Sequence, residues 1–248
     1  MVQLGGVGSF IPLTGEASMD AWEALEKEIV GCRKCPRLVA WREEVARKKR
    51  RAYRDWTYWG RPVPGFGDRN ARVLIVGLAP GAHGANRTGR MFTGDGSGDF
   101  LYPALYRAGF ANQPTATHRG DGLTLHDVFI TAVVRCVPPQ NRPTAQEIAT
   151  CLPYMGREID LLPNLQVIVT LGRIAFDWTL RLYRERGYTI PRWRFAHGAT
   201  YSLGEGEPTI VASYHPSRQN TQTGRLTREM FDAIWEKVKE ILRGEERP

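Results

Sequence analysis

The stretch RVLIVG at residues 72–77 is followed by the glycine-rich run LAPGAHGANRTGRMFTGDG at 78–96, and this pair of segments is the clearest indication of the fold. A short apolar run without alternation is typical of a strand that is buried on both faces of a parallel sheet. Three further runs have the same character: VFITAVV at 128–134, QVIVTL at 166–171 and TIVAS at 209–213. The sequence therefore predicts four buried strands.

Helical patterns lie between and after these runs, at about 98–109, 144–160, 172–186 and 225–242. An earlier helix is predicted from an N-cap at Ser18 to about Val30. Alternating strands and helices predict a three-layer α/β/α sandwich around a central, mainly parallel four-stranded sheet. We expect a loose N-terminal arm at residues 1–17 and a single domain at 18–248.

The composition is that of an ordinary soluble protein: of 248 residues, 42% are hydrophobic and 24% are charged. No apolar run reaches the roughly 18 residues of a membrane span, and no secretory signal is evident, so we expect a cytoplasmic protein and, by default, a monomer. The net charge is +8. Seven of the basic residues fall within residues 42–54: Arg42, Arg47, Lys48, Lys49, Arg50, Arg51 and Arg54. They predict a polyanionic partner such as nucleic acid, or else a solvated helix face or flexible surface segment.

The four cysteines form two pairs, Cys32 with Cys35 in C-x2-C and Cys136 with Cys151 in C-x14-C. In a cytoplasmic protein this pattern favours a metal site over disulfides. Thiolates select zinc or an iron–sulfur cluster, and the spacing alone leaves both open. Four unrelated buried cysteines are the remaining alternative. A metal here would brace the N-terminal helix against the loop after the second strand, whose helix Thr144 can cap.

Ligands of parallel sheets bind at the carboxyl ends of the strands. The loops after Gly77, Val134, Leu171 and Tyr214 are therefore the candidate site. His215, which Pro216 follows, is well placed there to act on a ligand, although a lone histidine at a strand end is often structural. The glycines after residue 77 let backbone approach a ligand closely.

Four motifs taken together resemble the uracil-DNA glycosylase superfamily: GLAPG at 77–81, MFTG at 91–94, VRCVPPQNRP at 134–143 and HPS at 215–217. The cysteine spacing is similar to that of the iron–sulfur branches, families 4 and 5. The stretches at 83–90 and 215–227 are most similar to family 5. This resemblance spans about residues 30–240 and implies a [4Fe–4S] cluster on the four cysteines, a DNA substrate and hydrolysis of an N-glycosidic bond.

The sequence departs from the wider superfamily at three positions. Leu78 and Ala79 stand where most members carry an acidic or amide residue that positions water, and Ala132 stands where family 4 has an asparagine. Family 5 shares such losses. A pocket with fewer fixed polar groups tolerates more bases, so the resemblance implies activity on uracil and on other deaminated or modified bases.

The resemblance also implies roles for individual residues, with the target nucleotide flipped out of the DNA stack. Phe92 would stack on the flipped base, and His215 would stabilise the negative charge that the leaving base gains. Ala79 and Gly81 would hold the base or water through backbone N–H groups. Asp95 would orient the attacking water, unless it only forms a turn. Further contacts are expected from His83 and Asn86 to base or water, and from Arg142, Ser217, Arg218, Gln219 and Asn220 to DNA.

No lysine lies in these motifs, so we expect a water nucleophile and a monofunctional enzyme. Two other functions remain open. A protein that binds damaged DNA without cutting it would explain the apolar Leu78 and Ala79. An iron–sulfur redox protein is disfavoured because no flavin or nicotinamide motif is present.

Overall fold

The structure, a computed structural model, describes residues 15–244. The expected arm at 1–17 lies outside these residues except at its end, where helix α1 (Gly15–Gly31) begins three residues before the predicted start at Ser18. None of the described helices is long and apolar enough to cross a membrane.

The sheet has the strand order β1-β3-β2-β4-β6-β5. Its four central strands are parallel and match the four predicted runs: β2 (Val73–Gly77), β3 (Val128–Ala132), β4 (Val167–Leu171) and β6 (Thr209–Ser213). Two antiparallel edge strands, β1 (Phe66–Gly67) and β5 (Thr200–Ser202), make it six-stranded rather than four-stranded. With two and three residues, these edges are too short to produce a periodic pattern in the sequence.

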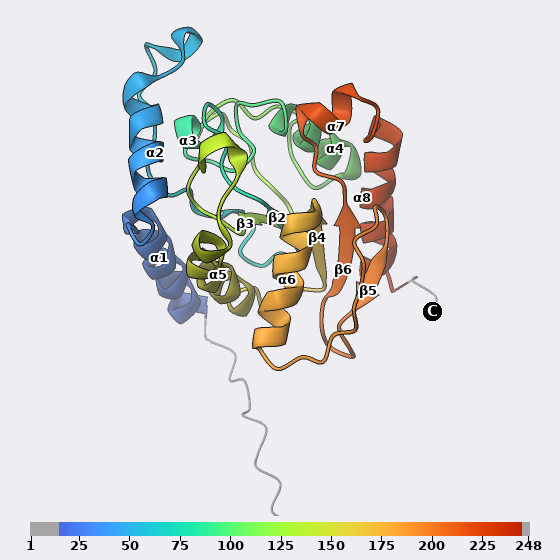
Figure 1. Ribbon diagram of the computed structural model, residues 1–248. Helices are drawn as coiled ribbons and strands as arrows, with labels where there is room; N and C mark the ends of the chain where they lie inside the picture. Colours follow the sequence, from blue (N-terminus) through green and yellow to red (C-terminus); the bar gives the residue numbers. More distant parts are fainter. Residues whose placement is uncertain (1–14, 245–248) are drawn as a thin grey trace, which may run out of the picture.

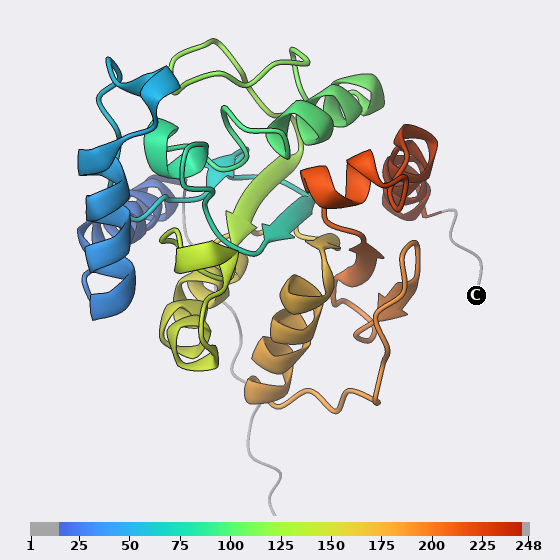
Figure 2. The ribbon, with the colours of Figure 1, turned by 45° about the horizontal axis from the view of Figure 1, so that its top comes forward.

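Helices cover both faces of the sheet, which confirms the three-layer prediction (Figures 1 and 2). Alternate residues of β2 pack on opposite sides, with Val73 and Ile75 facing one core and Leu74 and Val76 facing the other. The first core contains α4 (Gly98–Ala108) and α8 (Arg228–Leu242), and the second contains α5 (Ala145–Asp160) and α6 (Arg173–Glu185).

Helix α5 begins as the sequence predicts. Thr144 and Glu147 form a reciprocal capping box, with Glu147 N donating to Thr144 Oγ1 at 3.2 Å and Thr144 N donating to Glu147 Oε2 at 2.8 Å. Helix α8 is capped by Thr227, so it starts three residues later than the predicted 225.

Helix α2 (Pro36–Lys48) and the 3₁₀ helix η1 (Arg51–Tyr53) carry the basic run. Neither was predicted as a separate element. Arg42 was counted with the surface charge, but its residue is only 2% exposed, so that interpretation is wrong for this one residue. The other six remain at least partly exposed. The remaining short helices are α3 (Ala85–Thr88), η2 (Pro139–Asn141) and α7 (Arg218–Gln222).

Candidate active site and cysteine cluster

His215 lies two residues beyond the end of β6, at the carboxyl edge of the sheet. Its backbone is fixed by Asn220, whose Nδ2 donates to His215 O at 2.9 Å. The imidazole itself has no hydrogen-bond partner in the described part of the chain. Burial lowers the pKa of His215 to about 4, so the ring is neutral at neutral pH and offers one N–H to a ligand.

Phe92 lies beside His215, with ring centroids 5.9 Å apart and planes inclined by 33°. Its backbone has a φ of +51°, a left-handed conformation that bulky residues rarely adopt and that is often found at functional sites. The ring covers Gly77 at the end of β2, where a Cβ would come within 2.8 Å of Phe92 Cζ. The structure thus brings together the predicted stacking ring and the predicted histidine.

The residues around Phe92 hold its loop in place. Tyr102 of α4 donates its hydroxyl to Met91 O at 2.7 Å. Arg90 and Asp121 form a buried bidentate ion pair with distances of 2.8 and 2.7 Å, and Arg90 Nε donates to Thr93 Oγ1 at 2.9 Å. Burial opposes ionisation of Asp121, but the hydrogen bonds from Arg90 and from backbone N–H groups outweigh it and hold the pKa of Asp121 well below its usual range.

Asp95 uses its two carboxylate oxygens differently. Oδ1 accepts from Ser97 N at 3.0 Å and from Gly98 N at 3.1 Å, at the start of α4. Oδ2 has no donor among the described residues and faces the glycine-rich turn, where a Cβ on Gly81 would lie 2.8 Å away and one on Gly84 only 1.9 Å away. Burial raises the pKa of Asp95. One oxygen caps a helix, and the other remains available to a ligand.

Not all of the residues predicted in the glycine-rich loop lie beside Phe92 and His215. His83 Nδ1 contacts the Tyr58 hydroxyl at 3.0 Å. Asn86 is fully buried, and its Nδ2 donates to Arg42 O at 3.3 Å. Both side chains therefore face α2 and the segment after it. Gly81 instead faces Asp95, and Ala79 packs against the core that contains α5 and α6.

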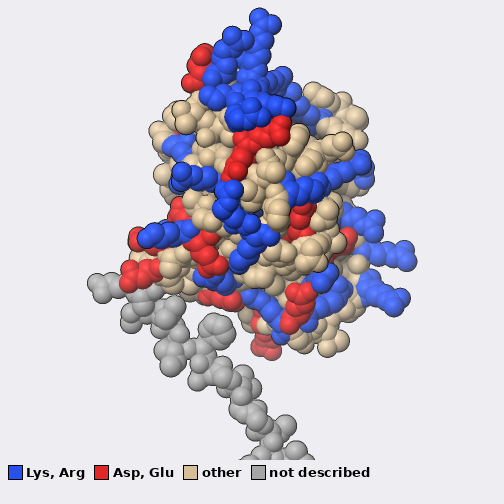
Figure 3. All heavy atoms as spheres, turned by 60° about the vertical axis from the view of Figure 1, so that its left-hand side comes forward, with Lys and Arg blue, Asp and Glu red and all other residues tan. Residues whose placement is uncertain are grey.

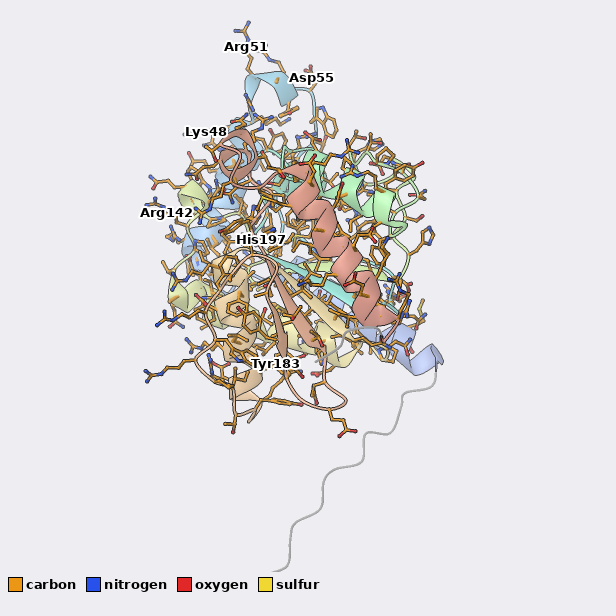
Figure 4. All side chains as sticks on the ribbon, turned by 90° about the vertical axis from the view of Figure 1, so that its right-hand side faces the viewer. Lys48, Arg51, Asp55, Arg142, Tyr183 and His197 are labelled. Atoms are coloured by element: carbon orange, nitrogen blue, oxygen red, sulfur yellow. The ribbon has the colours of Figure 1, made fainter. Side chains whose placement is uncertain are left out.

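The predicted DNA contacts divide into two groups. Ser217 caps α7, with its Oγ accepting from Asn220 N at 3.4 Å. Arg218 crosses to the glycine-rich loop, where a Cβ on Gly96 would lie 2.6 Å from Arg218 Nε, and Gln219 is exposed beside it. Arg142 lies apart, exposed in the loop before α5 (Figure 4).

A cavity of about 470 Å³ opens beside His215 and is lined by Leu78, Gly172, Tyr214, Asn220 and Arg225 among others. An aromatic wall that was not predicted from the sequence lies next to this cavity. Tyr214 stacks on His197 at 4.9 Å with planes 9° apart, and the Arg225 guanidinium lies 4.7 Å from the centre of the Tyr214 ring. Tyr214 precedes His215 in the sequence, so its place near the site could have been predicted. His197 lies in a segment without any recognisable pattern.

Cys32 follows α1, Cys35 precedes α2, Cys136 lies in the loop after β3, and Cys151 lies in α5. They form no disulfide. Burial raises the pKa of Cys35, of Cys136 to about 11 and of Cys151 to about 12. Negative charge on a neighbouring cysteine also raises these pKa values. Cys32 contributes to the shift of all three residues, and Cys136 contributes to the shift of Cys151. Cys32 packs against the small core that contains Cys151, and Cys35 packs against the core that contains Cys136. We call these four residues the cysteine cluster.

Two nitrogen donors are directed at these thiols. Arg42 Nη1 donates to Cys136 Sγ at 2.9 Å and to Cys32 O at 3.2 Å, and Arg135 N donates to Cys151 Sγ at 3.3 Å. Within residues 15–244, no group of three or more histidine, cysteine, aspartate or glutamate side chains is arranged to hold a metal ion. Four cysteine side chains, two of whose sulfur atoms accept N–H hydrogen bonds, are a donor set of the kind that suits an iron–sulfur cluster.

Curated relatives resemble the chain over most of its length. A Type-5 uracil-DNA glycosylase of Thermus thermophilus is 53% identical over 219 residues, covering 88% of this chain and 97% of the relative. A Type-5 uracil-DNA glycosylase of Mycobacterium tuberculosis is 50% identical over 238 residues, covering 96% and 83%. A solved structure, that of SMUG2 from Pedobacter heparinus, covers 71% of this chain and 77% of its own with a TM-score of 0.45 and 13% identity.

The family model of the Uracil DNA glycosylase superfamily matches residues 64–239, which include every strand of the sheet, Phe92, Asp95 and His215. The resemblance predicted from four motifs is confirmed, as is its closeness to the fifth type. The chain belongs to the uracil-DNA glycosylase superfamily.

Proposed function

We propose that this protein hydrolyses the N-glycosidic bond of uracil, and of other deaminated bases, in DNA and leaves an abasic site. The observation that carries the proposal is the juxtaposition of Phe92 and His215 at the carboxyl edge of the sheet, 5.9 Å between ring centroids. Asp95 lies on the same loop as Phe92, and one of its carboxylate oxygens accepts no hydrogen bond from residues 15–244. The family membership supports DNA as the substrate.

His215 would stabilise the leaving base. As the glycosidic bond breaks, a base oxygen gains negative charge, and a preorganised donor in a site shielded from water stabilises that charge more than it stabilises the ground state. Because its pKa is about 4, His215 would act as a neutral donor and not as a cation. The imidazole has no competing partner within the described chain, so no protein hydrogen bond has to be broken.

Asp95 would orient the water that attacks the sugar. Its Oδ2 faces Gly81 and Gly84, where the missing side chains leave room for a small molecule. A raised pKa makes the carboxylate a stronger base, which favours partial proton removal from water. Among the described residues, no lysine lines the cavity beside His215, so we propose a water nucleophile and no lyase step.

The base pocket would be permissive because two positions that could carry a polar group to read the base are apolar. Leu78 lines the cavity with its apolar side chain. Ala132, at the end of β3, has no side-chain group that can form a hydrogen bond. The neighbouring Thr131 cannot substitute, since its hydroxyl is buried and donates to Glu158 at 2.5 Å. A base that presents different edge groups would therefore leave few protein groups unpaired.

Cys32, Cys35, Cys136 and Cys151 would hold a [4Fe–4S] cluster. When bound, such a cluster supplies a covalent link among α1, α2, the loop after β3 and α5. The chain's own contribution is to hold the thiols together and to donate hydrogen bonds from Arg42 and from the Arg135 backbone to two of their sulfur atoms.

The test is excision from fluorescent duplexes that contain uracil, hypoxanthine, xanthine or no lesion, with and without alkali. We expect alkali-dependent cleavage at uracil and at one deaminated purine or both. His215→Ala should slow single-turnover excision at least about tenfold, while the same change at the exposed His126 should not.

Each result has a distinct meaning. Cleavage at uracil alone would keep the glycosylase and contradict the permissive pocket, and cleavage without alkali would contradict the absence of a lyase step. Tight binding of damaged DNA with no cleavage would overturn the proposal in favour of a non-catalytic damage-binding protein.

A further inference from the structure

The run of basic residues at the end of α2 continues into a projection formed by residues 47–56, which we call the basic arm. It projects beyond the sheet at the same end of the molecule as α7 (Figures 1 and 2). Lys and Arg side chains gather over it in Figure 3, and Arg51 points outward at its tip in Figure 4. None of the contacts described for the glycosylase chemistry uses these side chains.

The cations of the basic arm are largely unneutralised. Arg47, Arg50, Arg51 and Arg54 are exposed, and none forms an ion pair with a carboxylate in residues 15–244. Lys48 pairs with Glu44 at 2.5 Å, and Lys49 Nζ donates to Arg54 O at 3.1 Å. Like charges crowded in this way repel one another, and a polyanion relieves the repulsion while its own counterions are released.

The basic arm is also anchored rigidly. The guanidinium of Arg87 lies between the rings of Tyr53 and Trp56, at 4.0 and 4.1 Å from their centres. Arg87 itself is 4% exposed, in α3 of the glycine-rich loop. A buried cation held between two rings fixes the projection without covering its outer arginines.

Arg87 also ties the basic arm to the candidate active site. Its Nε donates to His83 O at 2.7 Å and its Nη2 to Gly94 O at 3.0 Å, next to Asp95 in the sequence. A second link runs through Tyr58, whose hydroxyl contacts both Arg50 N at 3.4 Å and His83 Nδ1 at 3.0 Å. The charge of Arg50 even contributes to lowering the pKa of His83, after burial.

From this arrangement we infer that the basic arm binds the phosphodiester backbone of duplex DNA beside the lesion, as a contact separate from α7. The inference rests on the proposed function for the choice of polyanion. A preorganised set of exposed guanidinium groups suits phosphates, which they contact without regard to base sequence. The arm would thus position the duplex, while Arg87 transmits that position to the loop that carries Phe92 and Asp95.

The test is the salt dependence of binding to a lesion-free duplex and to a duplex with a stable abasic-site analogue, measured by fluorescence anisotropy. The variant is the triple change Arg50→Gln, Arg51→Gln and Arg54→Gln. Each lost phosphate contact should reduce the slope of log K against log salt concentration by about 0.9, so the triple variant should lose about 2 to 3 from the slope. Its affinity at low salt should fall at least about tenfold on both duplexes.

The matched control removes the same charge from residues far along the chain, by Arg184→Gln, Arg192→Gln and Arg194→Gln in and after the end of α6. We expect its slope to equal that of the unchanged protein. Equal losses in both variants would show that only net charge matters, and an unchanged slope in the arm variant would show that the arm does not contact DNA. Either result overturns the inference.

This design separates the inference from the proposed function, because lesion-free binding does not depend on excision. If the protein excises uracil but the arm variant keeps the salt slope, the basic arm does not bind DNA and the proposed glycosylase function stands. If the arm variant loses salt slope but the unchanged protein excises no base, the proposed glycosylase function is wrong and the basic arm still binds DNA. Melting temperatures of both variants, which alter only exposed side chains, control for folding.

Discussion

At the scale of single residues, the protonation of His215 is set by its surroundings. In an unfolded chain its pKa is about 6.5, whereas burial lowers it to about 4 in the folded protein. The unfolded state therefore binds more protons below pH about 6.5, and stability falls as the pH decreases from there toward 4. Above that range His215 contributes no pH dependence.

We expect His215 to cause no inflection in the rate of single-turnover excision near pH 6.5, because the ring is already neutral there. Its contribution to the rate should decline only at more acid pH, where the ring gains a proton. NMR titration of the imidazole gives an independent value. An imidazole midpoint near 6.5 would contradict the neutral donor, and the Asp95→Asn variant separates any inflection of the rate that arises from Asp95, whose pKa burial raises.

Asp95 allows the helix-capping and catalytic interpretations to be separated. In Asp95→Asn the remaining carbonyl oxygen can still accept from Ser97 N and Gly98 N, so the melting temperature should change little. Excision should nevertheless fall about 10²-fold or more, as expected for loss of a general base. Asp95→Ala should lose about 1 kcal/mol of stability in addition. If the asparagine variant excises at the original rate, Asp95 is only a helix cap.

The sequence was informative about which loop carries the chemistry and less so about side-chain direction. Phe92 and His215 follow different strands, and the parallel sheet brings them together as predicted. His83 and Asn86 belong to the same loop as Phe92, yet that loop turns through α3 and directs both side chains toward Tyr58 and α2. Such a turn depends on long-range contacts that no local pattern encodes.

At the scale of elements, the loop that carries Phe92 depends on the buried Arg90–Asp121 ion pair. Removing one partner leaves an uncompensated buried charge, so Asp121→Asn should destabilise the protein by about 3 kcal/mol, measured by urea unfolding. The exposed pair Arg181–Glu185 serves as the control, and its disruption should cost less than about 1 kcal/mol.

The same variant tests what the ion pair does for the site. Because Phe92 is held in a left-handed conformation, loosening its loop should slow excision by the folded protein as well. A destabilised protein that excises at an unchanged rate would show that the pair stabilises the fold without positioning Phe92. The stabilisation by Asp121 should be complete above pH about 4 and should be lost progressively as the pH falls from there toward its depressed folded pKa.

The elements that the sequence predicted share one property, a long or strongly apolar pattern. The four central strands and α4, α5, α6 and α8 were found within a few residues of their predicted bounds. The edge strands β1 and β5 were missed because they are short and held by pairing with β3 and β6. Helix α2 was masked by its charged residues, although Leu38, Val39 and Val45 give it a buried face.

At the scale of the whole molecule, the cysteine cluster and the basic arm lie at opposite ends of the same helix. Cys35 precedes α2, and the arm begins where α2 ends. Arg42, halfway along, donates to Cys136 Sγ and accepts from Asn86 through its backbone carbonyl. A group bound to the four thiols would therefore fix α2 against the sheet and, through α2, the basic arm.

Loss of the group bound to the four cysteines should reduce DNA affinity more than it reduces the rate of base excision. We expect Cys136→Ser to lose iron and visible absorbance and to lower the melting temperature by about 10 °C or more, since a bound cluster stabilises only the folded state. Its DNA affinity and salt slope should decline toward those of the arm variant. The excision rate at saturating enzyme should decline less, because Phe92 and His215 follow β2 and β6 and contact none of the four cysteines. Full retention of melting temperature and affinity without iron would show that the cysteines do not brace the protein.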